Sequence, residues 1–142
     1  MREIFCSQSR KERKGIEMNE NEISKIIVDR CYKIHNSLGP GLLESVYEEL
    51  LAFELTKTGL NITRQQGLPV VYEGKKLELG FRADIIVENK VIIEIKSCEG
   101  LAPVHFKQLL TYLRITGLKL GLLVNFNEAL IKDGMKRVVN NL

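Results

Sequence analysis

The sequence predicts a single mixed α/β domain in which helices flank a central mixed sheet. Apolar side chains recur at helical spacing over residues 23–38 and 103–116. Residues 77–88 and 91–96 instead alternate along the chain, as strands do. The run at 118–126 is apolar on both faces, which is typical of a central strand. Because the helix at 103–116 lies between two strands, it predicts a parallel, right-handed crossover.

The two N-terminal helices are predicted from the same spacing and from signals at their ends. The first would run from a cap at Asn21 to Leu38, where Gly39-Pro40-Gly41 cannot continue a helix. The second is expected over about residues 42–57 and would end at Gly59. Its core-facing residues are predicted to be Leu43, Val46, Tyr47, Leu50 and Phe53.

The strand region begins with candidate strands at 61–66 and 68–72 and a turn at 73–76. Alternation then predicts that one face of the next strand carries Leu77, Leu79, Phe81, Ala83, Ile85 and Val87. Gly117 would close the helix at 103–116. A last short helix is expected over residues 133–141.

Composition describes an ordinary globular protein, with 44% apolar and 27% charged residues. Residues 1–17 carry five basic and three acidic side chains and are expected to form a disordered basic arm, leaving 18–142 as the folded domain. The net charge of +3 argues against a tight clamp on nucleic acid by charge alone. No apolar run suits a membrane span or a signal peptide. Three cysteines without metal-ligand spacing are typical of reduced thiols in a cytoplasmic protein.

The most informative feature is a predicted hairpin that carries Asp84, Glu94 and Lys96. If its turn centres on Asn89, Asp84 lies opposite Glu94. Directly opposed side chains have Cβ atoms about 4.5–5.5 Å apart. Two carboxylates at that distance repel and raise one pKa, unless a hard divalent metal such as Mg2+ binds both. The spacing therefore predicts a metal site with a lysine beside it.

An ordinary hairpin with surface ion pairs would contain the same three residues, and the triplet alone leaves that interpretation open. The strand that ends at Lys96 is apolar on both sides before Glu94, as a buried strand would be. Because an unpaired buried carboxylate costs several kcal/mol, Glu94 is expected to have a partner.

Further polar residues could complete such a site. His105, Gln108 and Tyr112 share one face of the helix at 103–116, where an amide or a hydroxyl could hold a phosphate. A surface histidine and a boundary aromatic are the structural alternatives for His105 and Tyr112. Glu44 lies at the edge of the second helix's apolar face, either as an acid favoured by the helix dipole or as a further metal ligand.

The order of these motifs resembles that of the PD-(D/E)xK nuclease superfamily, whose signature is an Asp on one strand and Glu-x-Lys on the next. Asp84 and Glu94-Ile95-Lys96 match this signature, with Ala83 in place of the usual Pro. The segment Gln108–Tyr112 resembles the QxxxY element of the RecB-like and lambda-exonuclease branch.

A closer resemblance is to the small bacterial and archaeal family of GxxExxY proteins. The naming motif corresponds to Gly41, Glu44 and Tyr47, and the resemblance covers roughly residues 22–139. It implies a restriction-endonuclease-like α-β-β-β-α-β core. It also implies a metal-dependent nuclease that hydrolyses phosphodiester bonds, with DNA favoured over RNA.

The resemblance further implies a role for each residue of the site. Asp84, Glu94 and the Ile95 backbone carbonyl would bind Mg2+ or Mn2+, and Glu44 would hold the metal through water. The metal would lower the pKa of an attacking water. Lys96 would orient that water or offset charge on the phosphorane. The substrate phosphate would be positioned by Gln108 and Tyr112, with His105 beside them.

Three interpretations follow from the sequence. The leading one is an enzyme, a Mg2+-dependent phosphodiesterase, and the complete set of Asp, Glu, Lys, Gln and Tyr favours it. Near-neutral charge favours a non-catalytic nucleic-acid-binding or protein-interaction module that retains the fold, or an enzyme recruited by a protein partner. The third is a structural hairpin with ordinary ion pairs. Because one such site cuts one strand, cleavage of a duplex would use a homodimer or two visits.

Overall fold

The computed structural model describes residues 17–142, except for the side chain of Leu79. The disordered arm expected over residues 1–17 lies, apart from Glu17, outside the described residues. None of the helices in the described part is long and apolar enough to cross a bilayer. The elements are α2 (Glu20–Leu38), α3 (Glu44–Lys57), β1 (Ile62–Tyr72), β2 (Lys75–Val87), β3 (Val91–Lys96), α4 (Pro103–Thr116), β4 (Leu120–Asn125), the 3-10 helix η2 (Ile131–Gly134) and β5 (Met135–Val139).

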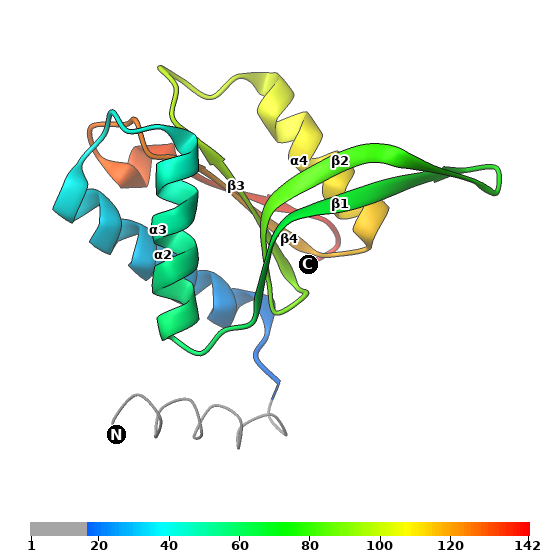
Figure 1. Cartoon of the computed structure of the whole chain (residues 1–142), viewed down its shortest axis with the longest axis horizontal. Coiled ribbons are helices and arrows are strands. Elements are labelled where there is room, and N and C mark those ends of the chain that lie inside the picture. The colour runs from blue at the N-terminus through cyan, green and yellow to red at the C-terminus, as the bar shows by residue number, and fades with distance from the viewer. Residues whose placement is uncertain (1–16) are drawn as a thin grey trace.

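The five strands form one sheet whose spatial order equals the chain order, β1-β2-β3-β4-β5 (Figure 1). Only β3 and β4 are parallel, and α4 makes the crossover between them. The other neighbouring strands are antiparallel. The succession α3-β1-β2-β3-α4-β4 is the predicted α-β-β-β-α-β core, so the mixed α/β fold class is confirmed.

Helices cover both faces of this sheet. Helices α2 and α3 lie on one face and α4 lies on the other (Figure 1). The larger core packs Ile23 of α2 and Leu51 of α3 against Ile93 of β3. The smaller core packs Leu109 of α4 against Ile92, which directly precedes Ile93 in β3 and points to the opposite face of the sheet. Strand β3 is therefore buried on both faces, which explains why its sequence is almost entirely apolar.

Several predicted boundaries are wrong. The cap of α2 is Asn19 rather than Asn21, because the Asn19 side chain accepts a hydrogen bond from the Glu22 N–H at 2.8 Å. The two strands expected between residues 61 and 72 are one strand, with an irregularity between Leu68 and Val70. The helix expected over 133–141 is instead η2 followed by β5, which pairs with β4. The β-branched Val138 and Val139 suit this strand.

The core-facing stripe predicted for α3 is correct for Tyr47 and in part for Leu50, which is half-buried against the larger core, and is wrong for Leu43, Val46 and Phe53. Leu43 and Phe53 are 72% and 60% exposed. The helix instead buries a stripe of residues four apart, Tyr47, Leu51 and Leu55. Because apolar residues lie around the whole helix, their spacing could not select the inward face. Packing against the sheet determines which face of α3 is buried, and other apolar side chains of the helix, such as Phe53, stay exposed to solvent.

The ribbon formed by β1 and β2 turns over near Asp84, which simple alternation did not predict. Ile85 and Val87 pack in the core under α2 and α3. Phe81 and Ala83, also odd-numbered, pack against the α4 side instead. The register places Gln65 opposite Asp84, and Gln65 has a φ of 52°, in the left-handed region. This residue marks the point at which the ribbon changes its buried face.

Tyr47 holds the connection between α2 and α3. Its hydroxyl donates a hydrogen bond to the Gly39 carbonyl at 2.6 Å and accepts one from the Leu42 N–H at 3.2 Å. Its ring stacks on Phe126, with the ring centroids 4.3 Å apart. Gly41, inside the loop that Tyr47 closes, has a φ of 100°, which glycine adopts without strain.

Replacing Tyr47 with Phe should lower the free energy of unfolding by about 1–2 kcal/mol, because the ring stays stacked while two part-buried hydrogen bonds are lost. Urea denaturation would measure the change. Tyr72→Phe is the matched control, since Tyr72 is 69% exposed and its hydroxyl should contribute less than about 0.5 kcal/mol. Equal effects at the two positions would contradict the role given to Tyr47.

Candidate metal and active site

The hairpin of β2 and β3 has the register predicted from its sequence. Ile85 pairs with Ile93 and Val87 with Val91, around a turn in which Asn89 has a φ of 52°. The pairing of β2 with β3 ends at Ile85 and Ile93. The two acids are the first residues beyond this last pair, Asp84 before Ile85 and Glu94 after Ile93. Asp84 therefore lies across the hairpin from Glu94, at the point where the two strands diverge.

Side chains replace the missing backbone bonds at this point. The Asp84 N–H donates to Glu94 Oε2 at 2.8 Å. In return, the Ile95 N–H donates to Asp84 Oδ2 at 2.8 Å. Each carboxylate is thus fixed by a backbone N–H of the neighbouring strand, which holds the two acids beside each other. We call Asp84 and Glu94 the acidic pair.

Burial and mutual repulsion disfavour the ionised form of the acidic pair. Burial, followed by the charge of Asp84, raises the pKa of Glu94 to about 8. Burial is also the main cause that raises the pKa of Asp84. The charge of Lys96 opposes both shifts. A bound cation would offset the repulsion between these two desolvated carboxylates and favour their ionised form.

The acidic pair lacks the ion pairs that an ordinary structural hairpin would show. Within residues 17–142, neither Asp84 nor Glu94 forms a salt bridge, and Lys96 forms none either. Exposed acids elsewhere do find partners, as Glu49 does with Arg64. The geometry therefore disfavours the interpretation of a structural hairpin closed by ion pairs.

The donor set fits Mg2+ or Mn2+. The backbone N–H groups bind one oxygen of each carboxylate, Oε2 of Glu94 and Oδ2 of Asp84. Each carboxylate keeps a second oxygen, and that of Asp84 accepts only a long hydrogen bond of 3.3 Å from the Gln65 amide. The Ile95 carbonyl lies on the same edge of β3 as its N–H, which points at Asp84. Mg2+ commonly takes one or two carboxylates and keeps several waters. Since the described residues hold no cluster of three or more His, Cys, Asp or Glu, the carbonyl, water or substrate would supply the other ligands.

Glu48 is a third acid near the acidic pair, and the sequence analysis missed it. It is 7% exposed and accepts hydrogen bonds from Arg64 Nε at 3.1 Å and Gln65 Nε2 at 2.6 Å. The Gln65 amide also donates to Asp84 Oδ1 at 3.3 Å. After burial, the charge of Glu48 is a further cause that raises the pKa of both Asp84 and Glu94. Its position one helical turn after Glu44 was the available signal.

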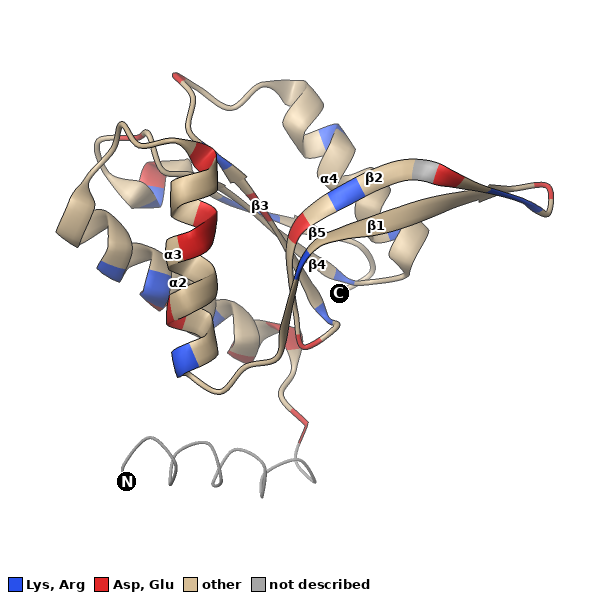
Figure 2. Ribbon diagram, in the orientation of Figure 1, with Lys and Arg blue, Asp and Glu red and all other residues tan. Residues whose placement is uncertain are grey.

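Glu44 lies at the first turn of α3 and contacts the chain just after Lys96. Its Oε2 accepts a hydrogen bond from the Ser97 N–H at 3.3 Å. Ser97 Oγ donates to the Leu42 carbonyl at 2.6 Å, so two bonds fix the end of β3 to the start of α3. Figure 2 shows acidic positions, in red, on α3 and on β2. Glu44 is therefore close to the lysine end of the site, and its part in metal binding stays a prediction.

The three polar residues predicted on α4 have different positions. Tyr112 is buried, its ring lies 4.8 Å from that of Phe81, and burial followed by the charges of Glu94 and Asp84 raises its pKa. Its hydroxyl is thus within electrostatic reach of the acidic pair. Gln108 is exposed, one turn before Tyr112. His105 caps the helix, because its Nδ1 accepts a hydrogen bond from the Ala102 N–H at 3.0 Å.

Comparison with known proteins identifies the family. The family model described as PD-(D/E)XK nuclease superfamily matches residues 21–138, which is most of the chain. The chain belongs to this superfamily. The resemblance to its signature at Asp84 and Glu94-Ile95-Lys96 is thereby supported at the level of the superfamily, while the closer assignment to GxxExxY proteins stays a prediction. Searches of curated proteins and of solved structures gave no significant match.

The pH dependence of stability should show the raised pKa of Glu94. Between its ordinary value of 4.5 and about 8, Glu94 loses its proton in the unfolded chain but keeps it in the fold. The unfolded state then binds fewer protons, so the free energy of unfolding of the metal-free protein falls as pH rises through this interval. Glu94→Gln should remove that fall and become more stable than the wild type at pH 8, by on the order of a few kcal/mol.

Urea denaturation at about pH 5 and pH 8 in a metal chelator would measure this difference. Glu99→Gln is the control, because Glu99 is exposed and its replacement should keep the wild-type pH dependence. An identical pH dependence in the wild type and Glu94→Gln would contradict the burial and repulsion assigned to the acidic pair.

Proposed function

We propose that the chain is a metal-dependent nuclease that hydrolyses phosphodiester bonds, with DNA favoured as substrate. Membership of the PD-(D/E)XK superfamily suggests nuclease activity. The observation that carries the proposal is the acidic pair, in which a buried Glu94 and a half-buried Asp84 are held in register by reciprocal hydrogen bonds without a salt bridge in residues 17–142. Such an arrangement suits a site whose charge is balanced by a bound cation.

Each residue has a role that follows from its position. Asp84, Glu94 and the Ile95 carbonyl would hold Mg2+ or Mn2+, which when bound polarises the phosphate and lowers the pKa of an attacking water. Lys96 follows Glu94 by two residues on the same strand and carries no salt bridge within the described part. Its ammonium group would orient the water or offset charge that develops on the phosphorane.

The remaining residues would support the acidic pair and the substrate. Glu44 would hold a metal-associated water at the lysine end, where it already contacts Ser97. Glu48, through Gln65, would fix the orientation of the Asp84 carboxylate. Gln108 and Tyr112 would position the scissile phosphate. His105 has its Nδ1 engaged by the Ala102 N–H, so only Nε2 is available for a substrate contact.

The proposal includes a nucleic-acid partner and a cytoplasmic location. With 21 basic and 18 acidic side chains, the chain would depend on bound metal, on a homodimer or on a recruiting protein for affinity. A homodimer would also place two sites on a duplex, since a single site of this kind cuts one strand.

One observation favours the alternative, a non-catalytic nucleic-acid-binding or protein-interaction module with the same fold. Two large apolar side chains are exposed in and beside α3, Phe53 within the helix and Leu43 at its N-terminal cap. A recruiting partner would cover such side chains in either interpretation. The two interpretations differ in whether the acidic pair supports cleavage.

The decisive experiment compares metal binding with cleavage in variants of the acidic pair. Calorimetric titration of Mg2+ and Mn2+ should show binding to the wild type that Asp84→Asn and Glu94→Gln abolish. The same samples are then incubated with labelled single-stranded and duplex DNA and RNA. Cleavage should fall at least about 100-fold in both variants, because each removes a charge that holds the cation. Glu99→Gln, which alters an exposed acid, is the control.

Binding and cleavage that disappear together would support the nuclease. Metal binding without cleavage of any substrate would favour the interaction module. Absence of binding at millimolar metal would contradict both the metal site and the proposed chemistry.

Lys96→Ala should reduce cleavage by about 100-fold while leaving Mg2+ affinity within about twofold, because the ammonium group acts on the reacting water and not on the cation. Single-turnover cleavage and calorimetry on the same preparations would separate the two effects. Lys107→Ala, an exposed lysine on α4, is the matched control. Equal loss of binding and cleavage would show that Lys96 has a different role.

A further inference from the structure

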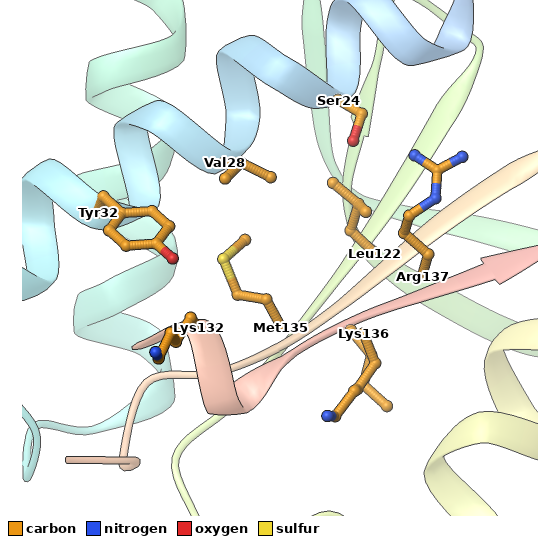
Figure 3. Close-up of a pocket in the computed structure, with 9 residues that line it drawn as sticks. Ser24, Val28, Tyr32, Leu122, Lys132, Met135, Lys136 and Arg137 are labelled. Carbon is orange, nitrogen blue, oxygen red and sulfur yellow. The ribbon is translucent and has the colours of Figure 1, made fainter. Parts of the chain in front are cut away.

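A cleft lies between α2 and the η2–β5 segment, away from the acidic pair (Figure 3). In the sheet, β4 lies between β5 and β3, the strand that carries Glu94. Its volume is about 200 Å3. Ser24, Val28 and Tyr32 of α2 line one side, and their spacing of four residues places them along a single helix face. Met135 and Arg137 line the other side. The cleft is therefore a slot that runs along two turns of α2.

One end of the slot contains a hydroxyl that has no protein partner among residues 17–142. Ser24 is 5% exposed and makes no hydrogen bond within residues 17–142. Figure 3 shows its hydroxyl pointing into the cleft, beside the guanidinium group of Arg137. Arg137 donates to Asn21 Oδ1 at 2.9 Å. No carboxylate of the described residues pairs with it. The Ser24 hydroxyl and the Arg137 guanidinium group can both donate hydrogen bonds, so this end suits a ligand that accepts them.

The middle of the slot is apolar and its other end is again cationic. Val28, Leu122 and Met135 form the apolar part. Lys132 lies at the Tyr32 end (Figure 3) and forms no salt bridge within the described residues. No acidic side chain lines the cleft. The lining is thus complementary to an anion that carries an apolar group.

The edge position of β5 explains only part of this arrangement. Charged side chains on an edge strand prevent pairing with another molecule. Lys136 suits that role, because it borders the cleft but its side chain points away from it (Figure 3). Arg137 instead lies on the side of α2, and pairing places it next to Leu122. Protection of the edge does not require the Ser24 hydroxyl, which belongs to a different element.

We propose that this cleft binds a small organic anion. Its carboxylate or phosphate group would accept hydrogen bonds from Arg137 and Ser24, and a short apolar or aromatic body would cover Val28, Leu122 and Met135. A cleft of about 200 Å3 is smaller than the roughly 300–1,000 Å3 of sites for drug-sized ligands. The ligand is accordingly the size of a substituted benzene ring. This site is separate from the acidic pair and does not depend on nuclease activity.

The proposal is tested by nuclear magnetic resonance titration of the full chain, labelled with 15N, in the absence of metal. The probes are 3-phenylpropionate and phenyl phosphate, which share an aromatic body and differ in the anionic group. The matched neutral probe is 3-phenyl-1-propanol. Both anions should cause saturable shift changes in residues of α2, η2 and β5. They should bind about tenfold more tightly than the alcohol, because hydrogen bonds to a charged group are stronger than those to a neutral hydroxyl.

Two variants test which end of the cleft binds the anionic group. Arg137→Gln should weaken binding of both anions by about tenfold or more and leave the alcohol unaffected. Lys136→Gln, one residue away but pointing out of the cleft, should change affinity by less than about twofold. The stronger of the two anions identifies the group that the site prefers. The proposal is overturned if the alcohol binds as tightly as the anions, if Lys136→Gln has the larger effect, or if neither anion causes saturable shifts up to about 10 mM.

Discussion

The exchange of hydrogen bonds between Asp84 and the neighbouring strand is the interaction on which the rest of the site depends. The Asp84 N–H donates to Glu94, and the Ile95 N–H donates to Asp84. These bonds take the place of the strand pairing that ends at Ile85. They satisfy backbone groups that would otherwise be left unpaired in a half-buried position. They also bring two like charges together, which burial makes unfavourable until a cation or a proton is added.

The surrounding fold fixes the acidic pair from three sides. Helix α3 supplies Glu48, which reaches Asp84 through the amide of Gln65. The left-handed backbone of Gln65 coincides with the turn-over of the β1–β2 ribbon, so the twist and the amide contact arise at one residue. On the opposite face, Tyr112 of α4 lies close enough for its pKa to be raised, after burial, by the charges of the pair. The strands β2 and β3 thus fix the positions of Asp84 and Glu94, while α3 and α4 supply the side chains that surround them.

The parts of this arrangement that sequence could predict are those governed by local spacing. The hairpin register follows from the turn at Asn89, and α4 has the predicted limits because Pro103 and Gly117 define its ends. The buried face of α3 was not predictable, since apolar residues surround that helix and only docking on the sheet distinguishes Leu51 from Phe53. Glu48 was missed for the same reason. The turn-over at Asp84 depends on a left-handed Gln65, a conformation that the residue type does not signal.

The order of strands in the sheet has a consequence for how the chain folds. Since each strand lies beside its predecessor in sequence, no strand has to insert between two that are already paired. The pairing of β2 with β3 joins residues that are close in sequence, so we expect this hairpin to form early, with both carboxylates still hydrated. Docking of β4 beside β3, with α4 across the other face, then removes water from Glu94. On this order of events, the repulsion between the two carboxylates would rise only after the hairpin that positions them has formed.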